Sequence, residues 1–403
     1  MVLDKSSSPG QLAWRRFRRN YLAVSGGIFL LLCVFIGLFS YFLMPDASTN
    51  ANFQSLEFAR KPPGTKAVFL LKARPLPEEK ASGFFSVLWN GKPDLFEPIP
   101  VHSLESIRIQ NDSIYYVSFV GLKERKLLST FLTQEELRLS GLAQNQTLKS
   151  QADAFLNKNS SPANPNEFLA NHVLVRKFYL GTDGYGRDVL SRLILGTRVS
   201  LSVGFLAVLI SLIVGIFLGA IAGFFGGWTD SIVMWFTSVI WSIPTLLLAI
   251  SLTFIWEKGF WQVFIAIGLS MWVEVARIVR GQILFIREMQ YIEASKSLGY
   301  SSFRTIFVHV VPNVLNPVII IAAANFASAI LVEAGLSFLG VGVQAPVPSW
   351  GGMIREGYTF IIFDSGKWLA LVPGIAIVLV VISLNLFGFG LRDALDPKAS
   401  ARL

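Results

Sequence analysis

The sequence predicts an all-α polytopic membrane protein with six transmembrane helices and an inserted extracytoplasmic α+β loop or domain between the first two helices. Hydrophobic residues make up 53% of the 403-residue chain, and its mean hydropathy is +0.54, which is too apolar for an ordinary soluble domain. Several apolar runs reach the ~20 residues that a helix needs to cross ~30 Å of hydrocarbon. One long polar stretch interrupts them, between the first and second runs.

The first element is a cytoplasmic N-terminal segment, residues 1–20, followed by a transmembrane helix at residues 21–44. Four arginines lie between residues 15 and 19, and none lies beside the other end of the apolar run. Because cytoplasmic flanks retain Lys and Arg, this bias places the N-terminus in the cytoplasm. The run is too long for a signal-peptide core and no small-residue cleavage pattern follows it, so we expect an uncleaved anchor.

Residues 45–175 form the predicted extracytoplasmic insertion, where the composition shifts toward Pro, Asn, Ser, Lys and Glu. Thr133 followed by Glu136 is a plausible capping box for one or two helices within Phe131–Ala154, and Asn157–Asn166 is typical of a linker. An irregular loop with some strand pairing remains an alternative to a folded α+β domain. Alternating apolar positions predict four short strands, at Lys66–Ala73, Phe84–Trp89, Glu105–Gln110 and Ser113–Gly121.

Residues 176–391 hold the other five predicted spans, and residues 392–403 form a cytoplasmic tail. Trp241, Ser242 and Pro244 indicate a break in the third span. Six crossings return the C-terminus to the cytoplasm, and the basic residues around the fourth to fifth span connection agree with that side. The five spans are expected at about Val199–Phe225, Ser231–Ile255, Trp261–Val279, Val314–Val332 and Trp368–Gly390.

A cytoplasmic loop at about residues 283–313 has the pattern of a rigid elbow. Glu293–Leu298 can form a short helix that Gly299 ends with a positive φ, and Ser301 or Ser302 can cap a second helix running to about Val311. Pro312 and Pro317 follow at the start of the next span, where the missing N–H costs least. An ordinary inter-helix loop is the alternative.

A second polar motif, Gly181–Asp188, precedes the second span. It lacks the terminal Lys-Ser/Thr of a phosphate-binding loop, so a nucleotide site is not expected. Asp183 can instead accept backbone N–H groups at a helix start and pair with Arg187 four residues later. A structural role is favoured over substrate binding. The motif residues are Gly181, Thr182, Asp183, Gly186, Arg187 and Asp188.

Polar residues within the spans are candidates for a translocation path, because burying them in hydrocarbon is unfavourable. The candidates are Asn325, Glu333 and Asn385. Small and polar residues also hold membrane helices together, so packing is an equal alternative.

Several classes of function are excluded or disfavoured. The sequence holds no HExxH, Gly-x-Ser-x-Gly or Walker A motif, so no catalytic residue, cofactor or ATP hydrolysis by this chain is expected. His102, His172 and His309 are too scattered for a metal site. The net charge of +9 fits cytoplasmic Lys and Arg better than a nucleic-acid partner. Cys33 is the single cysteine, which rules out an intrachain disulfide.

Four segments together resemble one known family. Glu293, Ala294, Gly299, His309 and Pro312 are similar to the coupling loop (EAA motif) of ABC-transporter permeases. Ser295 departs from the general loop motif, where a second alanine stands, and so does His309, although histidine there resembles the peptide subfamily. Three further segments resemble the C-type permease subunit of dipeptide, oligopeptide and nickel ABC importers: Gly181–Arg192 followed by Gly196–Leu201, Glu333–Gly340 with Pro348–Gly351, and Gly390–Pro397.

The resemblance implies the transmembrane permease subunit of an ATP-driven importer in the cell inner membrane, for di/oligopeptides or a related small solute. Its implied partners are a homologous second permease, two ATP-binding cassette subunits, an extracytoplasmic substrate-binding protein and the lipid bilayer. The loop Glu293–Pro312 would couple ATPase motion to alternating access. The insertion exceeds that of a typical member, and a similar enlargement in microcin-uptake permeases leaves the substrate class open. The alternatives are a membrane-anchored sensor or structural protein working through its outer domain, and a stand-alone secondary transporter.

Overall fold

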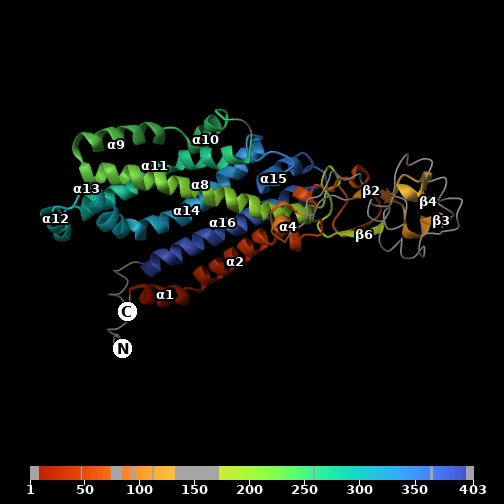
Figure 1. Ribbon diagram of the computed structural model, residues 1–403, viewed down its shortest axis with the longest axis horizontal. Coiled ribbons are helices and arrows are strands. Elements are labelled where there is room, and N and C mark those ends of the chain that lie inside the picture. The colour runs from red at the N-terminus through yellow and green to blue at the C-terminus, as the bar shows by residue number, and fades with distance from the viewer. Residues whose placement is uncertain are drawn as a thin grey trace, which may run out of the picture. The chain divides into compact units, whose positions relative to one another are not determined.

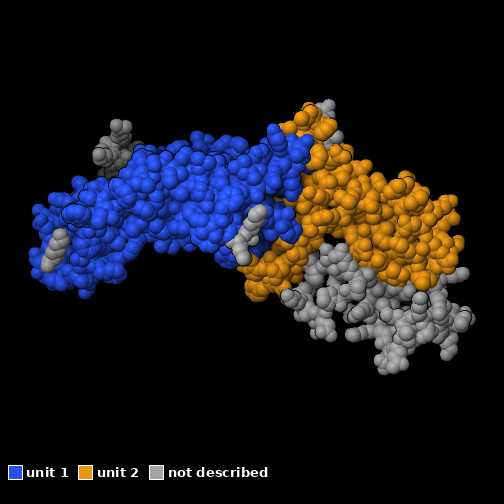
Figure 2. All heavy atoms as spheres, turned by 90° about the horizontal axis from the view of Figure 1, so that it is seen from above, with its two compact units in different colours: residues 1–38, 196–359, 368–403 blue, residues 39–195, 360–367 orange. Residues whose placement is uncertain are grey.

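The computed structural model describes residues 9–46, 48–73, 84–91, 96–110, 113–131, 172–256, 259–363 and 366–395. The chain divides into two compact units (Figure 2). We call residues 1–38, 196–359 and 368–403 the helical unit, and residues 39–195 and 360–367 the insert unit. The predicted helices within Phe131–Ala154, their Thr133–Glu136 capping box, the Asn157–Asn166 linker and most of the C-terminal tail lie outside the described residues.

The helical unit contains the predicted spans (Figure 1). Within the described ranges, five helices are long and apolar enough to cross a membrane, and a sixth candidate is a pair of helices bent by 90°. The elements are α1 (Pro9–Arg19), α2 (Tyr21–Leu38), α8 (Val189–Phe225), α9 (Gly227–Trp241), α10 (Thr245–Thr253), α11 (Phe260–Ile286), α12 (Gln290–Ser297), α13 (Ser302–Arg304), a π-helical turn (Thr305–Val310), α14 (Val311–Leu339), α15 (Trp350–Tyr358) and α16 (Lys367–Leu395).

The bent pair is α9 and α10, so the predicted break in the third span is confirmed. Pro244 lies directly before α10 with an extended ψ of 128°, and its ring has no N–H to continue the ladder from α9. The first predicted span, residues 21–44, is divided into α2, which ends at Leu38, and the short α3 (Ser40–Leu43), whereas α8, α11, α14 and α16 extend beyond the predicted spans. The second predicted span, for example, begins ten residues earlier than expected, at Val189.

Glycines allow α8 and α11 to pack closely. Gly215, Gly219 and Gly223 recur every four residues and therefore lie on one face of α8. A Cβ atom at Gly219 would lie 2.5 Å from the carbonyl oxygen of Ala276 on α11, and one at Gly215 would lie 2.8 Å from that of Trp272. A core cluster of the unit lies nearer the starts of these two helices and includes residues of α14, among them Ala329 and Leu336.

The described residues of the insert unit form two three-stranded antiparallel sheets, ordered β2-β1-β6 and β3-β4-β5. The central strand of the first sheet pairs Leu70 with Ile99 on one side and with Val173 on the other. Short 3₁₀ turns lie at Thr49–Ala51, Leu56–Phe58, Leu104–Ser106 and Leu128–Thr130. The remaining elements are α3 (Ser40–Leu43), α4 (Phe84–Asn90), β1 (Thr65–Ala73), β2 (Phe96–Val101), β3 (Arg108–Gln110), β4 (Ser113–Val117), β5 (Lys123–Leu127) and β6 (Val173–Phe178).

The strand predictions are confirmed for β1 and β4 and in part for β3. The predicted strand at Phe84–Trp89 is wrong, because this segment forms helix α4. Phe84 and Phe85 are both exposed and Leu88 is buried, a helical rather than an alternating pattern. The ring of Phe84 stacks on that of Phe42 in α3, with centroids 5.4 Å apart.

Candidate functional site

The predicted elbow is present at the start of the long helix that ends at Leu339. Helix α12 ends at Ser297, and Gly299 then adopts a left-handed φ of +77°. The hydroxyl of Ser301 accepts a hydrogen bond from the N–H of Arg304 at 3.4 Å, which caps the next helical turn. From Ser302 the chain stays helical for 38 residues. The elbow is therefore continuous with a membrane span.

One face of the elbow is buried and the other is exposed. Ile292 and Ile306 pack with Val279 and Ile283 from the end of α11. Glu293 and Ala294 are exposed, and Leu298 shows 72% of its surface. Ser295 is buried, and its hydroxyl donates to the carbonyl of Ile292 at 2.7 Å, so its small side chain fits against the unit. The arrangement holds the loop firmly while presenting an acidic and apolar surface to solvent.

His309 lies in a stack of rings at the base of the elbow. Its imidazole is nearly parallel to the ring of Tyr300, with centroids 5.7 Å apart and planes 9° apart. The guanidinium of Arg304 lies 4.4 Å from the same tyrosine ring. The amide of Asn313 donates to the carbonyl of His309 at 2.6 Å, and Pro312 lies in the first turn of α14. These contacts agree with packing rather than with proton chemistry for this histidine.

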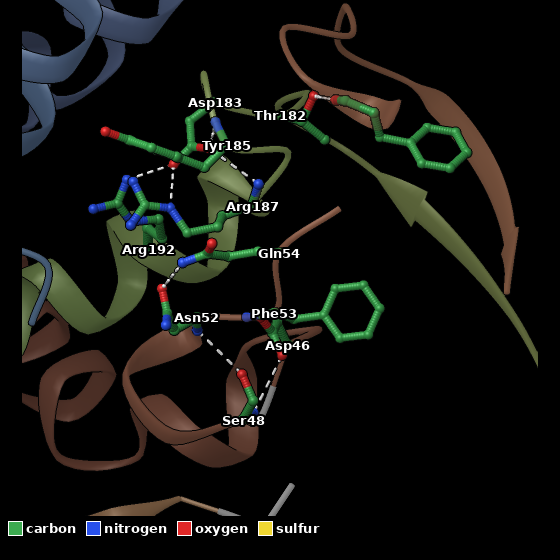
Figure 3. Close-up of polar contacts among 11 residues, drawn as sticks. Asp46, Ser48, Asn52, Phe53, Gln54, Thr182, Asp183, Tyr185, Arg187 and Arg192 are labelled. Carbon is green, nitrogen blue, oxygen red and sulfur yellow. Dashed lines mark hydrogen bonds and ion pairs between the residues drawn. The ribbon is translucent and has the colours of Figure 1, made fainter. Parts of the chain in front are cut away.

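The Gly181–Asp188 motif forms a buried charged cluster in the insert unit (Figure 3). Asp183 accepts hydrogen bonds from the backbone N–H groups of Tyr185 at 2.8 Å and Arg187 at 3.0 Å. Its carboxylate also accepts a hydrogen bond from Arg187 Nε at 2.7 Å and another from a guanidinium nitrogen of Arg192 at 2.5 Å. The predicted Asp183–Arg187 ion pair is thus confirmed, and Arg192 joins it. Gly186 has a φ of +77°, and a Cβ there would overlap the backbone of Ser55.

A second half of the cluster lies at the start of α8. Asp188 accepts the N–H of Ser191 at 2.9 Å and the hydroxyl of the same residue, so it caps the helix. That hydroxyl accepts the backbone N–H of Asp46 at 2.9 Å. Arg176 on β6 lies 3.8 Å from the Asp46 carboxylate. Burial raises the pKa of Asp188 above its usual range because the carboxylate has lost its water.

Thr182 joins the motif to an earlier segment of the chain, Phe58–Lys61. The hydroxyl of Thr182 accepts the N–H of Lys61 at 2.8 Å and donates to the carbonyl of Phe58. The three acids of the cluster (Asp46, Asp183, Asp188) face three arginines (Arg176, Arg187, Arg192), so the buried charges balance. A buried cluster with balanced charges suits a structural role, which we call a structural pin, better than a substrate site.

The three path candidates lie inside the helical unit. Glu333 is completely buried, and its carboxylate accepts the hydroxyls of Ser200 on α8 at 3.1 Å and Ser337 at 2.7 Å. Asn325 is also buried, and no described residue accepts a hydrogen bond from its side-chain nitrogen. Asn385 is half-buried and donates to the carbonyl of Val381 at 2.9 Å. In this conformation, therefore, neither Asn325 nor Glu333 presents its side chain at a surface.

Sequence reasoning identified Arg277 and Arg280 only as basic residues on the cytoplasmic side, and it missed both their contacts with α9 and the exposed Glu274. Arg280 on α11 makes a two-pronged ion pair with Asp230 at the start of α9. The guanidinium of Arg277, one turn earlier, lies 3.7 Å from the ring centre of Trp241 at the end of α9. Glu274, near the middle of α11, is exposed. The signal that could have identified them is the presence of charged residues within or beside apolar runs, which is rare without a function or a partner.

The described residues contain no group of three or more His, Cys, Asp and Glu side chains that could hold a metal ion.

Comparisons with known proteins agree with the motifs. Residues 215–401 match the family described as "binding-protein-dependent transport system inner membrane component", and residues 8–63 match the "N-terminal TM domain of oligopeptide transport permease C". The chain is 43% identical over 220 residues to the dipeptide transport system permease protein DppC of Alkalihalophilus pseudofirmus, a match covering 55% of this chain and 72% of the relative.

Two further relatives have the same coverage of 55% and 72%. They are the oligopeptide transport system permease protein OppC of Bacillus subtilis, 39% identical, and the glutathione transport system permease protein GsiD of Pectobacterium atrosepticum, 38% identical. Among solved structures, an inward-facing form of the MetNI methionine ABC transporter matches with a TM-score of 0.43 and 16% identity, over 51% of this chain and 97% of that chain.

Proposed function

This chain belongs to the family of inner-membrane components of binding-protein-dependent transport systems, and we propose that it is the permease subunit of an ATP-driven importer of di- and oligopeptides. The cargo is inferred from relatives whose names specify dipeptides, oligopeptides and glutathione, all of which contain amide-linked amino acids. A related small solute would use the same machinery.

The observation that carries the proposal is the elbow at Gln290–Val310. One face of the elbow is exposed, and its C-terminal end leads directly into the membrane span α14. A partner that binds Glu293 and Ala294 would move α12, and the packing of Ile292 with Ile306 would pass that motion to the helix that runs without a gap from Ser302 to Leu339. The sequence has no Walker A motif, so ATP hydrolysis belongs to separate cassette subunits. Closure of those subunits would drive alternating access through this element.

A complete importer would need further partners. A second permease would supply the other side of the path, two cassette subunits would bind the two coupling loops, and an extracytoplasmic binding protein would deliver the peptide. In this arrangement the spans cross the inner membrane, and both termini and the elbow lie in the cytoplasm. The insert unit lies outside. The Gly181–Asp188 cluster would fix the insert unit at the start of α8.

The polar residues buried in the helical unit fit packing better than path lining. Glu333 joins α8 to α14 through Ser200, and Asn385 bonds within its own helix. A path role for Asn325, Glu333 or Asn385 would need these helices to separate during the transport cycle.

The test is purification of the chain from detergent-solubilised native membranes, with Glu293→Lys as the variant. We expect the wild type to bring down a second permease and cassette subunits, and Glu293→Lys to lose the cassette subunits while keeping the second permease. Glu97→Lys, an equal charge reversal on the exposed edge strand β2, is the matched control and should keep both. A wild-type chain that purifies alone and moves solute without ATP would overturn the proposal.

A further inference from the structure

Helix α11 has an exposed face that differs from the exposed faces of the other spans. On α8 the exposed residues include Phe205, Ile213 and Phe217, and on α16 they include Ile375 and Val378. Such faces suit lipid or an apolar helix partner. The face of α11 that its neighbours leave uncovered carries instead Glu274, Gly281 and Gln282, with Phe285 at its end.

Glu274 is the fifteenth of the 27 residues of α11, and it lies inside the predicted fourth span, five residues before the expected end of that span at Val279. No residue that the structure describes forms a hydrogen bond or ion pair with this carboxylate. A charged side chain at the centre of a bilayer costs roughly 2.5–3.5 kcal/mol or more when it faces lipid. The exposed face of α11 must therefore meet water or protein in the assembled transporter.

The nearest arginine along the helix does not serve as the partner of Glu274, because it is engaged elsewhere. The guanidinium of Arg277 lies against the ring of Trp241 and donates to the hydroxyl of Ser238 at 3.2 Å, both on α9. Arg280 is held by Asp230. Both arginines of α11 thus bind side chains of α9. The carboxylate of Glu274 is therefore available to a cation from outside this subunit.

We propose that Glu274 lines the water-filled path and binds the protonated amino terminus of a peptide in transit. This rests on the proposed function and adds a substrate contact to it. A peptide α-amino group has a pKa of ~7.7–8.0 and is mostly protonated at neutral pH, so a carboxylate inside a span and without a cationic partner among the described residues complements it. A single contact is weak enough to release the peptide again, as transport requires.

Accessibility to water is the first part of the test. Cys33 is the single cysteine, so a Cys33→Ala background allows labelling of one introduced thiol. We expect Glu274→Cys in the assembled transporter to react with a charged, membrane-impermeant methanethiosulfonate at least ten times faster than Ile213→Cys, which is 60% exposed on the apolar face of α8. Equal, slow labelling of both would overturn the proposal.

Transport by the assembled complex is the second part. We expect Glu274→Gln to lower ATP-driven dipeptide uptake into proteoliposomes by about tenfold, the loss of one charge-assisted contact, and Glu274→Asp to recover much of it. The ratio of wild-type to Glu274→Gln rates should fall toward one between pH 7 and 9, as the peptide amine loses its proton. An unchanged rate in Glu274→Gln would overturn the proposal.

One alternative occupant of this face is a basic side chain of the second permease. In that case Glu274→Gln would release the second permease on purification, and the proposal would be wrong. Failure of the proposed function is a separate result, because the wild-type complex itself would then show no ATP-dependent uptake.

Discussion

The buried carboxylate of Asp183 accepts hydrogen bonds from two guanidinium groups and two backbone N–H groups. Removing one partner of a buried ion pair leaves the other charges without compensation, at a cost of roughly 3–5 kcal/mol. We therefore expect Asp183→Ala to lower the thermal stability of the detergent-purified protein strongly. The measurement is the temperature at which a protease begins to cleave the insert unit, which should be lower than in the wild type.

The control for this prediction is Glu97→Gln, which removes the exposed Lys72–Glu97 pair on the same unit. Exposed pairs contribute about 0–1 kcal/mol, so its unfolding curve should nearly match that of the wild type. Equal losses in the two variants would contradict the account of the cluster as a structural pin.

Gly299 is the residue whose backbone conformation the elbow requires. Its φ of +77° is strained for an L side chain by about 1–2 kcal/mol, although a Cβ there would meet no atom within 4 Å. We expect Gly299→Ala to reduce peptide-stimulated ATP hydrolysis by the assembled complex. Gly299→Asn should retain more of that activity, because asparagine tolerates the left-handed region.

A matched control for that substitution lies in α16. Gly374 is helical and has no positive φ, and a Cβ there would meet no atom within 4 Å, so Gly374→Ala should leave stimulated hydrolysis unchanged. If Ala and Asn at position 299 behave alike, the backbone conformation is not what matters there.

At the scale of elements, the close contact between α8 and α11 depends on glycines, which have no side chain to separate the two helices. A methyl group at Gly219 would press on the backbone of Ala276, and overpacking of this kind costs about 1–3 kcal/mol. We expect Gly219→Ala to lower the melting temperature of the purified protein and its yield in membranes. The exposed face of the same helix supplies the comparison: Ile213→Ala should change the melting temperature little.

The sequence predicted helices better than strands in this chain, for a physical reason. An apolar run of more than twenty residues has one outcome in a bilayer, since its backbone must satisfy its own hydrogen bonds. Strand β2 was missed because Pro98 and Pro100 lie within it, and it tolerates them as an edge strand. Strand β5 was missed because Lys123–Leu127 is nearly all charged, as suits the edge of a sheet.

The candidate sites divide in the same way. The elbow and the Asp183–Arg187 pair follow local rules for caps, turns and four-residue spacing, so the sequence sufficed for their geometry. Whether a polar residue in a span faces inward or outward depends on which helices cover it. That is a tertiary property, and so Glu333 could not be distinguished in advance from Glu274.

At the scale of the whole molecule, the positive-inside pattern predicts opposite sides of the membrane for the elbow and the insert unit. In the Cys33→Ala background we expect Val120→Cys, in the exposed turn between β4 and β5, to react with an impermeant maleimide added to intact spheroplasts. Leu298→Cys, similarly exposed on the elbow, should react only after the membrane is opened. Labelling of both in intact spheroplasts would contradict the topology.

Strands β1 and β6 pair from Thr65 with Phe178 to Leu70 with Val173. The chain therefore leaves this stem and comes back to it about 5 Å away, the spacing of neighbouring strands, after an excursion of about a hundred residues. The β1–β6 pairing holds the two ends that rejoin the rest of the chain at this spacing, and β2, from within the excursion, pairs with the other edge of β1. A grafted module, such as a fluorescent reporter or an antibody epitope, would therefore begin and end at two neighbouring strands if it were placed beyond this stem.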